Sequence, residues 1–309
     1  MREELGTEAN CSNRSTGGEQ CHGSDGRFPF LQVALLGSVF VVAAFGNLLF
    51  LHALWKKRKR NSRTQLFLLH LCIADLLLAF FQVLPQLFMG ITPHFRGSDV
   101  ACRAVKYLQV VGMSASAYLI VAMTVERYNA VCRPSVSFFR GSLRRYVAIG
   151  AAWATALAFS CPQLFIFSLR EMEEHVYDCQ ATFIDPWGSE IYITWVTLSV
   201  FVCPAVILLF CQIQICTGIY LNMKRKSLQT AAKEGRSASK GVSKTMLKTV
   251  KMTFVIIVVH MGCWSPFFLV QLWSTWNSQS AQTEAPAFIV TLLASLSCCT
   301  NPWIYLYYS

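Results

Sequence analysis

Charged residues are scarce in this chain, and their scarcity excludes an ordinary water-soluble domain. They make up 14% of the 309 residues, whereas a soluble domain carries about 25%. Hydrophobic residues make up 54% and gather in seven runs long enough to cross a bilayer. These runs are too long, and alternate too little, to be the strands of a membrane β-barrel. The sequence therefore predicts an all-α membrane protein, a seven-transmembrane helix bundle, with spans at about 30–54, 65–89, 104–131, 146–168, 191–219, 252–273 and 286–308.

Several functional classes are excluded by features that the sequence lacks. A retinal-binding seven-helix protein needs a lysine in its last span to form the Schiff base, and no lysine follows Lys251. The sequence has no HExxH or GxSxG motif and no Cys/His cluster, which argues against an enzyme. It has no internal repeat, which argues against a transporter built from repeated halves.

The positive charges lie in the connections on one side of the membrane. Lys and Arg number six in residues 56–63, four in 132–145 and nine in 220–251. The connections on the other side (1–29, 90–101, 169–190 and 274–285) hold five in all. This positive-inside asymmetry predicts an extracellular N-terminus. It also accounts for the net charge of +11, so we expect membrane lipid and no nucleic acid as a partner.

The chain is expected to consist of a tail and one membrane domain. Residues 1–29 form the extracellular tail and 30–309 the transmembrane domain, with a cytosolic loop three at about 220–251. The second half of that loop has helix-forming composition and is expected to extend span six. Asn10 and Asn13 each begin an Asn-X-Ser triplet in the tail, so we expect both to be glycosylated.

Four of the thirteen cysteines fall on the extracellular side, where disulfides form. Cys102 stands just before span three, and Cys179 lies within the loop between spans four and five. A bridge between them would hold that loop over the mouth of the bundle, and we favour it. A second bridge between Cys11 and Cys21 has weaker support, because the tail that carries them has the composition of a disordered segment.

Polar groups inside the bilayer are costly, so their positions are informative. At the cytosolic end of span three, Glu126 and Arg127 are adjacent. They form either an interface pair or a latch in which Glu126 holds Arg127 in one state and releases it in another. A second group lies near the midplane: Asn47, Asp75, Ser116 and Asn301. It is either a satisfied hydrogen-bond cluster or a hydrated site for a hard cation such as sodium, which oxygen ligands suit.

A third polar layer lies near the outer ends of four spans. It consists of Gln82, Gln86, Lys106, Gln109, Gln163 and Gln271. A single glutamine in a span usually makes a helix–helix hydrogen bond, but five at one depth favour a water-accessible cavity. Pro85 would bend its helix between the first two glutamines. Because amides both donate and accept, such a cavity suits a peptide ligand. Its apolar floor would be Met113, Trp264, Phe267 and Phe268.

Taken together, the sequence resembles the rhodopsin-like (class A) G-protein-coupled receptors. The resemblance covers all seven spans in order, through Asn47, Asp75, Cys102, Glu126-Arg127-Tyr128, Trp153, Pro204, Cys263-Trp264-Ser265-Pro266 and Asn301-Pro302-Trp303-Ile304-Tyr305. It implies a multi-pass cell-membrane receptor with a heterotrimeric G protein, arrestin and receptor kinases as partners. It also implies an activation switch that includes Glu126, Arg127, Tyr128, Asn301, Pro302 and Tyr305.

Longer stretches are similar to the vasopressin/oxytocin receptors, with a lean toward the antidiuretic, renal type. They include "FQVLPQLF" (81–88), "FRGSD" (95–99), "CRAVKYLQVVGM" (102–113), "PQLFIF" (162–167) and "CWSPFFLVQLW" (263–273). The family ligand is a disulfide-cyclised, amidated nonapeptide. The family pocket is lined by residues that match Gln82, Gln86, Lys106, Gln109, Met113, Gln163, Trp264, Phe267, Phe268 and Gln271.

The sequence departs from the family pattern at several positions. Gln180 stands in "DCQA" where the family has Trp, and "SLSCC" replaces "SLNSC", which removes an amide from the expected sodium site at Asp75 and Ser116. Gln212 and His260 stand where many class A receptors have aromatic residues. These departures concern the details of activation and ion binding.

The resemblance implies a receptor that works by population shift. Peptide binding would favour a state in which the cytosolic end of span six moves outward around Pro266 and frees Arg127 for a G protein. The renal-type resemblance implies stimulatory coupling and cyclic AMP. The alternatives are a family member that couples to phospholipase C and calcium, or a class A receptor for another small peptide. No cofactor is expected beyond the sodium ion.

Overall fold

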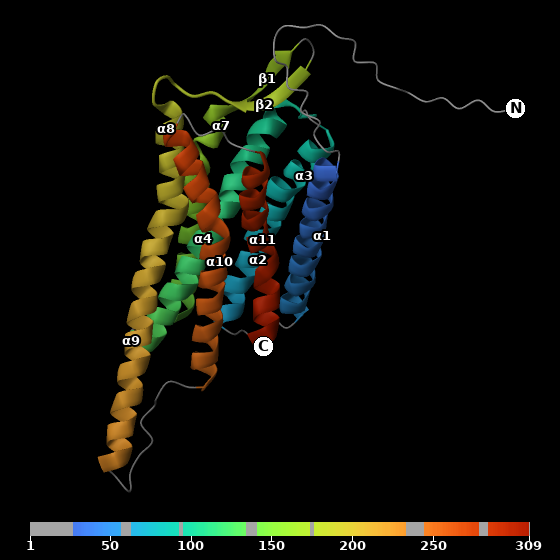
Figure 1. Ribbon diagram of the computed structural model, residues 1–309. Coiled ribbons are helices and arrows are strands. Elements are labelled where there is room, and N and C mark those ends of the chain that lie inside the picture. Colours follow the sequence, from blue (N-terminus) through green and yellow to red (C-terminus); the bar gives the residue numbers. More distant parts are fainter. Residues whose placement is uncertain are drawn as a thin grey trace, which may run out of the picture.

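The computed structural model describes residues 27–56, 63–92, 95–133, 141–173, 176–232, 244–277 and 284–308. Within these ranges seven helical spans are long and apolar enough to cross a membrane, which confirms the predicted fold class. The spans run side by side as one elongated bundle, with a small β-hairpin at one end (Figure 1). We call this the hairpin end; the positive-inside asymmetry assigns it to the extracellular side.

Four spans are continuous helices: α1 (Arg27–Lys56), α4 (Asp99–Cys132), α10 (Lys244–Trp276) and α11 (Glu284–Tyr308). The second span consists of α2 (Arg63–Leu78), the π-helical turn η1 (Ala79–Val83) and α3 (Leu84–Ile91). The fourth consists of α6 (Gly141–Ser160) and the short turn α7 (Gln163–Ile166). The fifth consists of α8 (Gly188–Val196), the π-helical turn η2 (Thr197–Val202) and α9 (Cys203–Ala232).

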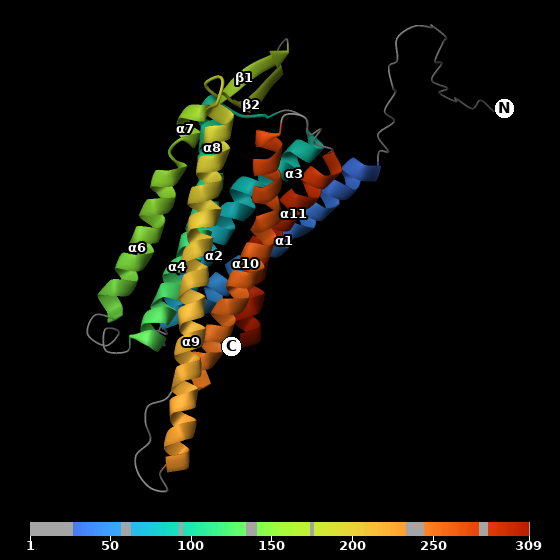
Figure 2. The same cartoon turned by 60° about the vertical axis from the view of Figure 1, so that its left-hand side comes forward.

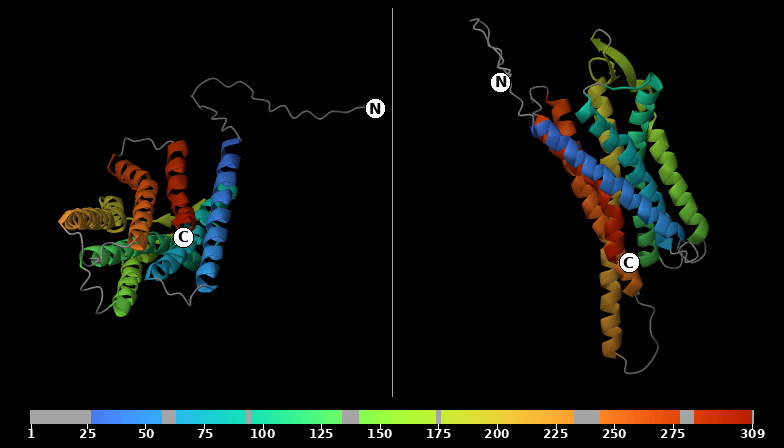
Figure 3. Two further views of the ribbon diagram at one scale, coloured as in Figure 1. Left: turned by 90° about the horizontal axis from the view of Figure 1, so that it is seen from below. Right: turned by 90° about the vertical axis from the view of Figure 1, so that its right-hand side faces the viewer.

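The helix α4 is the central element of the bundle. It packs on α2, α6 and α9, with α6 on its outer side (Figure 2). Its middle section, residues 110–117, is buried throughout. Gly112 permits the close approach of α2, because a Cβ there would lie 3.2 Å from the Leu78 backbone nitrogen and 3.3 Å from the Leu77 Cβ. Helix α1 lies obliquely against α11 and α2 at the edge (Figure 3).

The hairpin at the outer end was not expected from the sequence. Strands β1 (Phe167–Glu173) and β2 (Val176–Ala181) pair antiparallel, with Leu169 opposite Cys179. The base of the hairpin is closed by a hydrogen bond from the Thr182 N–H to the Ile166 carbonyl at 2.9 Å. The loop between spans four and five is therefore a built structure that begins where α7 ends.

At the opposite end, helical backbone continues into the stretch assigned to loop three. Helix α9 runs on to Ala232, and α10 begins at Lys244. The predicted extension of span six is therefore present, and the first part of the predicted connection, residues 220–232, is helical. Residues 220–232 lack glycine and proline, so nothing in their sequence stops the helix. The predicted glycosylation sites Asn10 and Asn13, and the second cysteine pair considered, Cys11 and Cys21, lie outside the described residues.

Candidate functional site

The second span changes its helical form where its two glutamines lie. The Leu84 N–H donates to the Ala79 carbonyl, five residues earlier, and Pro85 follows at the start of α3. Proline has no N–H and disfavours a regular helix before it, so a π turn accommodates the break. Gln82 is buried within η1, and Gln86 is half-buried on α3. The bend expected at Pro85 therefore takes the form of a π turn.

Two cavities lie under the hairpin, and we name them by the span beside them. The α2-side cavity, about 540 Å³, is lined by Gln82, Gln86, Lys106 and Gln109, with Asp178 and Cys179 from the hairpin. The α8-side cavity, about 190 Å³, is lined by Lys106, Gln109, Met113, Gln163, Phe267, Phe268 and Gln271. Lys106 and Gln109 line both cavities. Nine of the ten residues predicted for ligand binding therefore line these two adjacent cavities.

Trp264 is the exception among the ten. It lines neither cavity, and its side chain is only 2% exposed. Its ring packs beneath Phe267 and Phe268, with centroids 5.8 and 5.9 Å away. The expectation that Trp264 contacts ligand is therefore not met by this geometry. The tryptophan supports the floor from below, because α10 turns its indole toward the core.

Two glutamine side chains at the α2-side cavity have unsatisfied acceptors. The Oε1 atoms of Gln82 and Gln86 are buried and have no hydrogen-bond partner among the described residues. An unpaired buried acceptor costs about 1–3 kcal/mol. Water or a ligand with N–H groups would remove that cost. Gln163 differs, since its Nε2 donates to the Tyr192 hydroxyl.

Charged groups lie at the mouth of the α2-side cavity. The Lys106 ammonium lies 5.2 Å from the centre of the Phe167 ring. Arg96 and Asp178 line the same cavity as Lys106. Arg96 and Asp178 were not among the predicted residues, although their stretches "FRGSD" and "DCQA" had been noted. Tyr192, which lines the α8-side cavity, was also missed, because a tyrosine in an apolar span gives no distinct signal.

The hairpin is fastened over the cavities by a disulfide between Cys102 and Cys179. Cys102 is fully buried in the first turn of α4. Cys179 and the preceding Asp178 are hairpin residues that line the α2-side cavity. The loop therefore reaches the cavity at the position where the bridge holds it. Gln180, the departure from the family pattern, donates from Nε2 to the Asp178 carboxylate at 3.3 Å.

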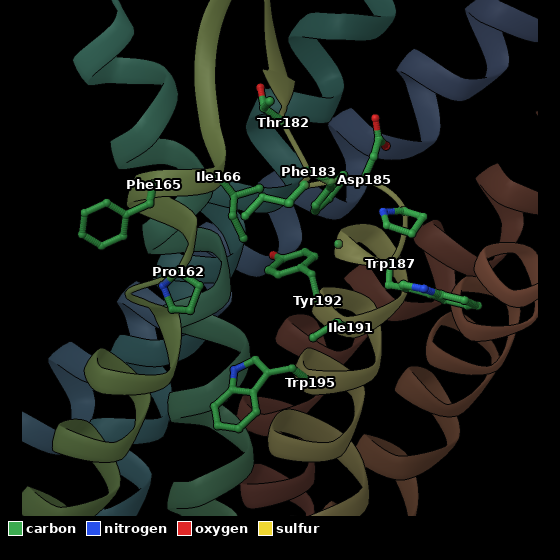
Figure 4. Close-up of a pocket in the computed structure, with 13 residues that line it drawn as sticks. Pro162, Phe165, Ile166, Thr182, Phe183, Asp185, Trp187, Ile191, Tyr192 and Trp195 are labelled. Atoms are coloured by element: carbon green, nitrogen blue, oxygen red, sulfur yellow. The ribbon is translucent and has the colours of Figure 1, made fainter.

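A third cavity, about 680 Å³, lies between α7 and α8 and is separate from the α2-side and α8-side cavities (Figure 4). Its lining is almost entirely apolar and comes from α7, the segment after β2, and α8. Tyr192 lines both this cavity and the α8-side cavity, so it forms the wall between them. None of the ten predicted residues lines it.

Apart from Asn301, which belongs to the midplane group, the predicted activation residues lie toward the end opposite the hairpin. Glu126 and Arg127 have partners on other helices. Arg144 on α6 donates from Nη2 to Glu126 Oε2 at 2.8 Å. Arg127 donates from Nη2 to the Thr64 hydroxyl on α2. Sequence reasoning considered only the adjacent pair of Glu126 and Arg127. The geometry instead links this acid to α6 and this arginine to α2.

The remaining activation residues pack nearby. Tyr128 joins a small apolar cluster with Ile215 and Val250, and its ring lies 5.7 Å from the Arg133 guanidinium. The Tyr305 ring lies 4.7 Å from that of Phe50 on α1. Pro302 lies inside α11.

The midplane group is partly satisfied. Asn301 Nδ2 donates to Asp75 Oδ2 at 2.8 Å, and Asn47 Nδ2 donates to the Cys298 carbonyl at 2.7 Å. The Oδ1 atoms of Asp75 and Asn47 are buried without a hydrogen-bond partner among the described residues, and Ser116 is buried too. The described residues contain no group of three or more His, Cys, Asp or Glu side chains placed to hold a metal ion. Two buried oxygen atoms are therefore available to coordinate a cation, but few further oxygen ligands surround them.

Comparison with known proteins identifies the class. Residues 46–305 match the family model of the 7 transmembrane receptor (rhodopsin family). Among curated relatives, the vasopressin V2 receptor of Canis lupus familiaris is 46% identical over 92% of this chain and 81% of its own length. The vasopressin V2 receptor of Bos taurus is 45% identical over 90% and 78%. The isotocin receptor of Catostomus commersonii is 44% identical over 90% and 74%.

The fold and these matches define a rhodopsin-type, G-protein-coupled receptor, a multi-pass protein of the cell membrane and not an enzyme. Within that class, the chain belongs to the vasopressin/oxytocin receptor family.

Proposed function

We propose that this receptor binds a disulfide-cyclised, amidated nonapeptide of the vasopressin and isotocin type in the two adjacent cavities. The observation that carries the proposal is the pair of unpartnered acceptors, Gln82 Oε1 and Gln86 Oε1, on the wall of the α2-side cavity. Both acceptors are buried in the ligand-free structure, so each glutamine side chain would turn its oxygen toward the cavity to accept from a backbone N–H group of a peptide. Gln109 and Gln271 offer further amides on the α8-side wall, above Met113, Phe267 and Phe268. This site matches a ligand with many amides and some apolar side chains.

We further propose that the receptor signals through a stimulatory G protein and cyclic AMP. The support is its similarity to two vasopressin V2 receptors, together with the renal-type motifs. The alternative is coupling to phospholipase C and calcium, as in the other branch of the family that the sequence resembles. The third possibility is that the chain is a class A receptor for another small peptide.

Activation would proceed by a population shift. The peptide would favour a state in which the cytosolic end of α10 moves outward about Pro266. In that state Arg127 would exchange its bond to Thr64 for contacts with a G protein. Arrestin and receptor kinases are further expected partners, and lipid is the expected neighbour of the apolar side chains exposed on the outside of the bundle.

The deciding experiment is a ligand panel on one cell line that expresses the receptor. Vasopressin, isotocin and unrelated amidated peptides would be applied while cyclic AMP and calcium are read in parallel. We expect nanomolar-range responses to the family peptides in the cyclic AMP channel. A calcium response without cyclic AMP would select the alternative coupling, and silence to both family peptides would refute the proposed ligand class.

We also propose a sodium ion beside Asp75. Its open Oδ1 and the buried Ser116 hydroxyl suit a hard cation, which oxygen ligands bind. The amide that the family supplies is absent here, where the sequence has Ser297 and Cys298. The residues present therefore fit a weakly held ion with water completing its shell.

A further inference from the structure

The first turn of α4 contacts the hairpin region through three residues on one helix face. Asp99, Cys102 and Arg103 stand at positions i, i+3 and i+4, which places their side chains together. Cys102 carries the disulfide to β2. Arg103 Nε donates to Asp99 Oδ2 at 2.7 Å, so the two charged side chains form a single unit. Ser98 caps the turn, because its hydroxyl accepts from the Ala101 N–H.

This charged unit bonds to backbone groups that the disulfide does not reach. Asp99 Oδ1 accepts from the Leu169 N–H on β1 at 2.8 Å. Arg103 Nη1 donates to the Leu164 carbonyl in α7 at 2.6 Å. Carbonyls in the last turn of a helix lack partners within the helix, so Arg103 satisfies a group that would otherwise be open. The unit therefore ties α4 to β1 and to α7.

The energetic value lies in the directed bonds to the backbone and not in the ion pair. The Arg103 and Asp99 side chains are 35% and 47% exposed. An ion pair that exposed contributes little, because solvent screens it. Hydrogen bonds from a charged group to a backbone partner are stronger than those between neutral groups, and their direction is fixed by the partner. The Asp99–Arg103 unit thus acts by fixing the positions of Leu169 and Leu164 relative to α4.

A disulfide alone fixes one point of the hairpin and leaves rotation about that point. The bond at Leu169 attaches the other strand, β1, directly opposite the bridged Cys179, and the bond at Leu164 attaches α7 just before the hairpin begins. With both strands and the turn before them attached to α4, rotation about the bridge is restricted. Both of these bonds neighbour cavity residues: Gln163 precedes Leu164, and Phe167, whose ring lies beside Lys106, separates the two attachments. A change in hairpin tilt would therefore move the roof of both cavities.

We propose that Asp99 and Arg103 are positioning residues for ligand binding. They set the tilt of the hairpin and the placement of Gln163, whereas the disulfide sets the distance between β2 and α4. The ligand part rests on the proposed peptide function. The clamp itself is a statement about this chain and can be tested without any ligand.

The ligand-free test is hydrogen exchange of purified receptor, read by mass spectrometry over residues 164–171. Asp99→Ala removes the acceptor of the Leu169 N–H, and Arg103→Ala removes the donor to Leu164. Both variants are expected to exchange at least about threefold faster in this segment. Arg170→Ala is the matched control, since it removes an exposed arginine from the same strand and should leave exchange unchanged. Exchange unchanged in both variants, or equally raised in the control, would overturn the clamp.

The ligand test measures association and dissociation of fluorescent vasopressin and isotocin on cells with matched surface levels of receptor. We expect about tenfold faster dissociation in either variant, since one charged hydrogen bond is worth about that factor. The double variant should lose little more than either single one, because the two residues act as one unit. Arg103→Lys should recover part of the loss.

The outcomes separate the clamp from the function. Faster exchange with unchanged dissociation would overturn the positioning role while leaving the clamp. Failure of both peptides to bind the wild-type receptor would refute the proposed function, and the exchange experiment would still decide the clamp.

Discussion

Arg144 on α6 donates to Glu126 on α4 across a distance of 2.8 Å, and the Glu126 side chain is only 7% exposed. The acid next to Arg127 is therefore neutralised by a residue eighteen positions further along the chain.

Removing Arg144 should destabilise the bundle at this end. Arg144→Ala leaves a buried carboxylate without this partner, at a cost of about 1–3 kcal/mol after allowance for the partial exposure of the arginine. The measurement is the apparent melting temperature of purified receptor. Arg145→Ala is the control, since it removes the neighbouring arginine. The combination with Glu126→Gln should cost less than the sum of the single changes, and strict additivity would contradict the pair.

Replacing Gln86 or Gln109 by Leu should weaken binding of vasopressin-type peptides by about tenfold or more, since each change removes an amide from the cavity wall. Affinity would be measured by saturation binding at equal surface expression. Gln32→Leu supplies the control, because Gln32 lies on α1 and lines neither cavity. Wild-type affinity in both cavity variants would remove the basis for an amide-lined site.

Replacing Cys179 by Ser should abolish high-affinity peptide binding. Without the bridge, β2 loses its covalent attachment to α4, and the roof of the α2-side cavity is no longer fixed. Binding would be measured on receptor quantified at the cell surface. Cys161→Ser changes a free, exposed cysteine and should bind normally. A Cys179 variant with native affinity would show that the tether is dispensable.

Gly112→Ala should lower thermal stability. The new Cβ would lie 3.2 Å from the Leu78 backbone nitrogen, so α2 and α4 must move apart. We expect a cost of about 1–3 kcal/mol, which exceeds the gain of up to about 1 kcal/mol in helix propensity. Gly150→Ala on α6 is the control: no atom lies within 4 Å of its Cβ, so its melting temperature should be unchanged or higher. Equal responses of the two variants would contradict the close approach.

Asp75→Asn should remove any response of agonist binding to sodium. In wild-type receptor, sodium chloride is expected to lower vasopressin affinity relative to an equal concentration of choline chloride. The variant loses the carboxylate charge that would hold the cation. A sodium response that survives in the variant would place the ion elsewhere, and its absence in the wild type would refute the site.

The seven spans and most of the cavity could be predicted from the sequence because bilayer thickness fixes helix length and because glutamines in lipid are conspicuous. Gln82, Gln163 and Gln271 lie far apart in the sequence, yet their equal depth brought them into one prediction. Trp264 was assigned to the ligand because depth does not say which way a side chain turns. The orientation of α10 decides that.

The missed features depend on contacts between segments. The bond from Arg103 to Leu164 and the pair of Arg144 with Glu126 join residues whose sequence spacing carries no signal. The hairpin could not be predicted because its strands are only seven and six residues long and lie in a connection between two spans. The π turn at η1 could be anticipated only as a disturbance near Pro85.

Lys106 and Gln109 form a wall that the α2-side and α8-side cavities share. A ligand in either cavity would restrict the Lys106 and Gln109 side chains, which a ligand in the other cavity also contacts. Two small fragments, one in each cavity, would consequently not bind independently: the first would raise or lower the affinity of the second through these two side chains. A ligand designed for one cavity must therefore be designed together with the group that occupies the other.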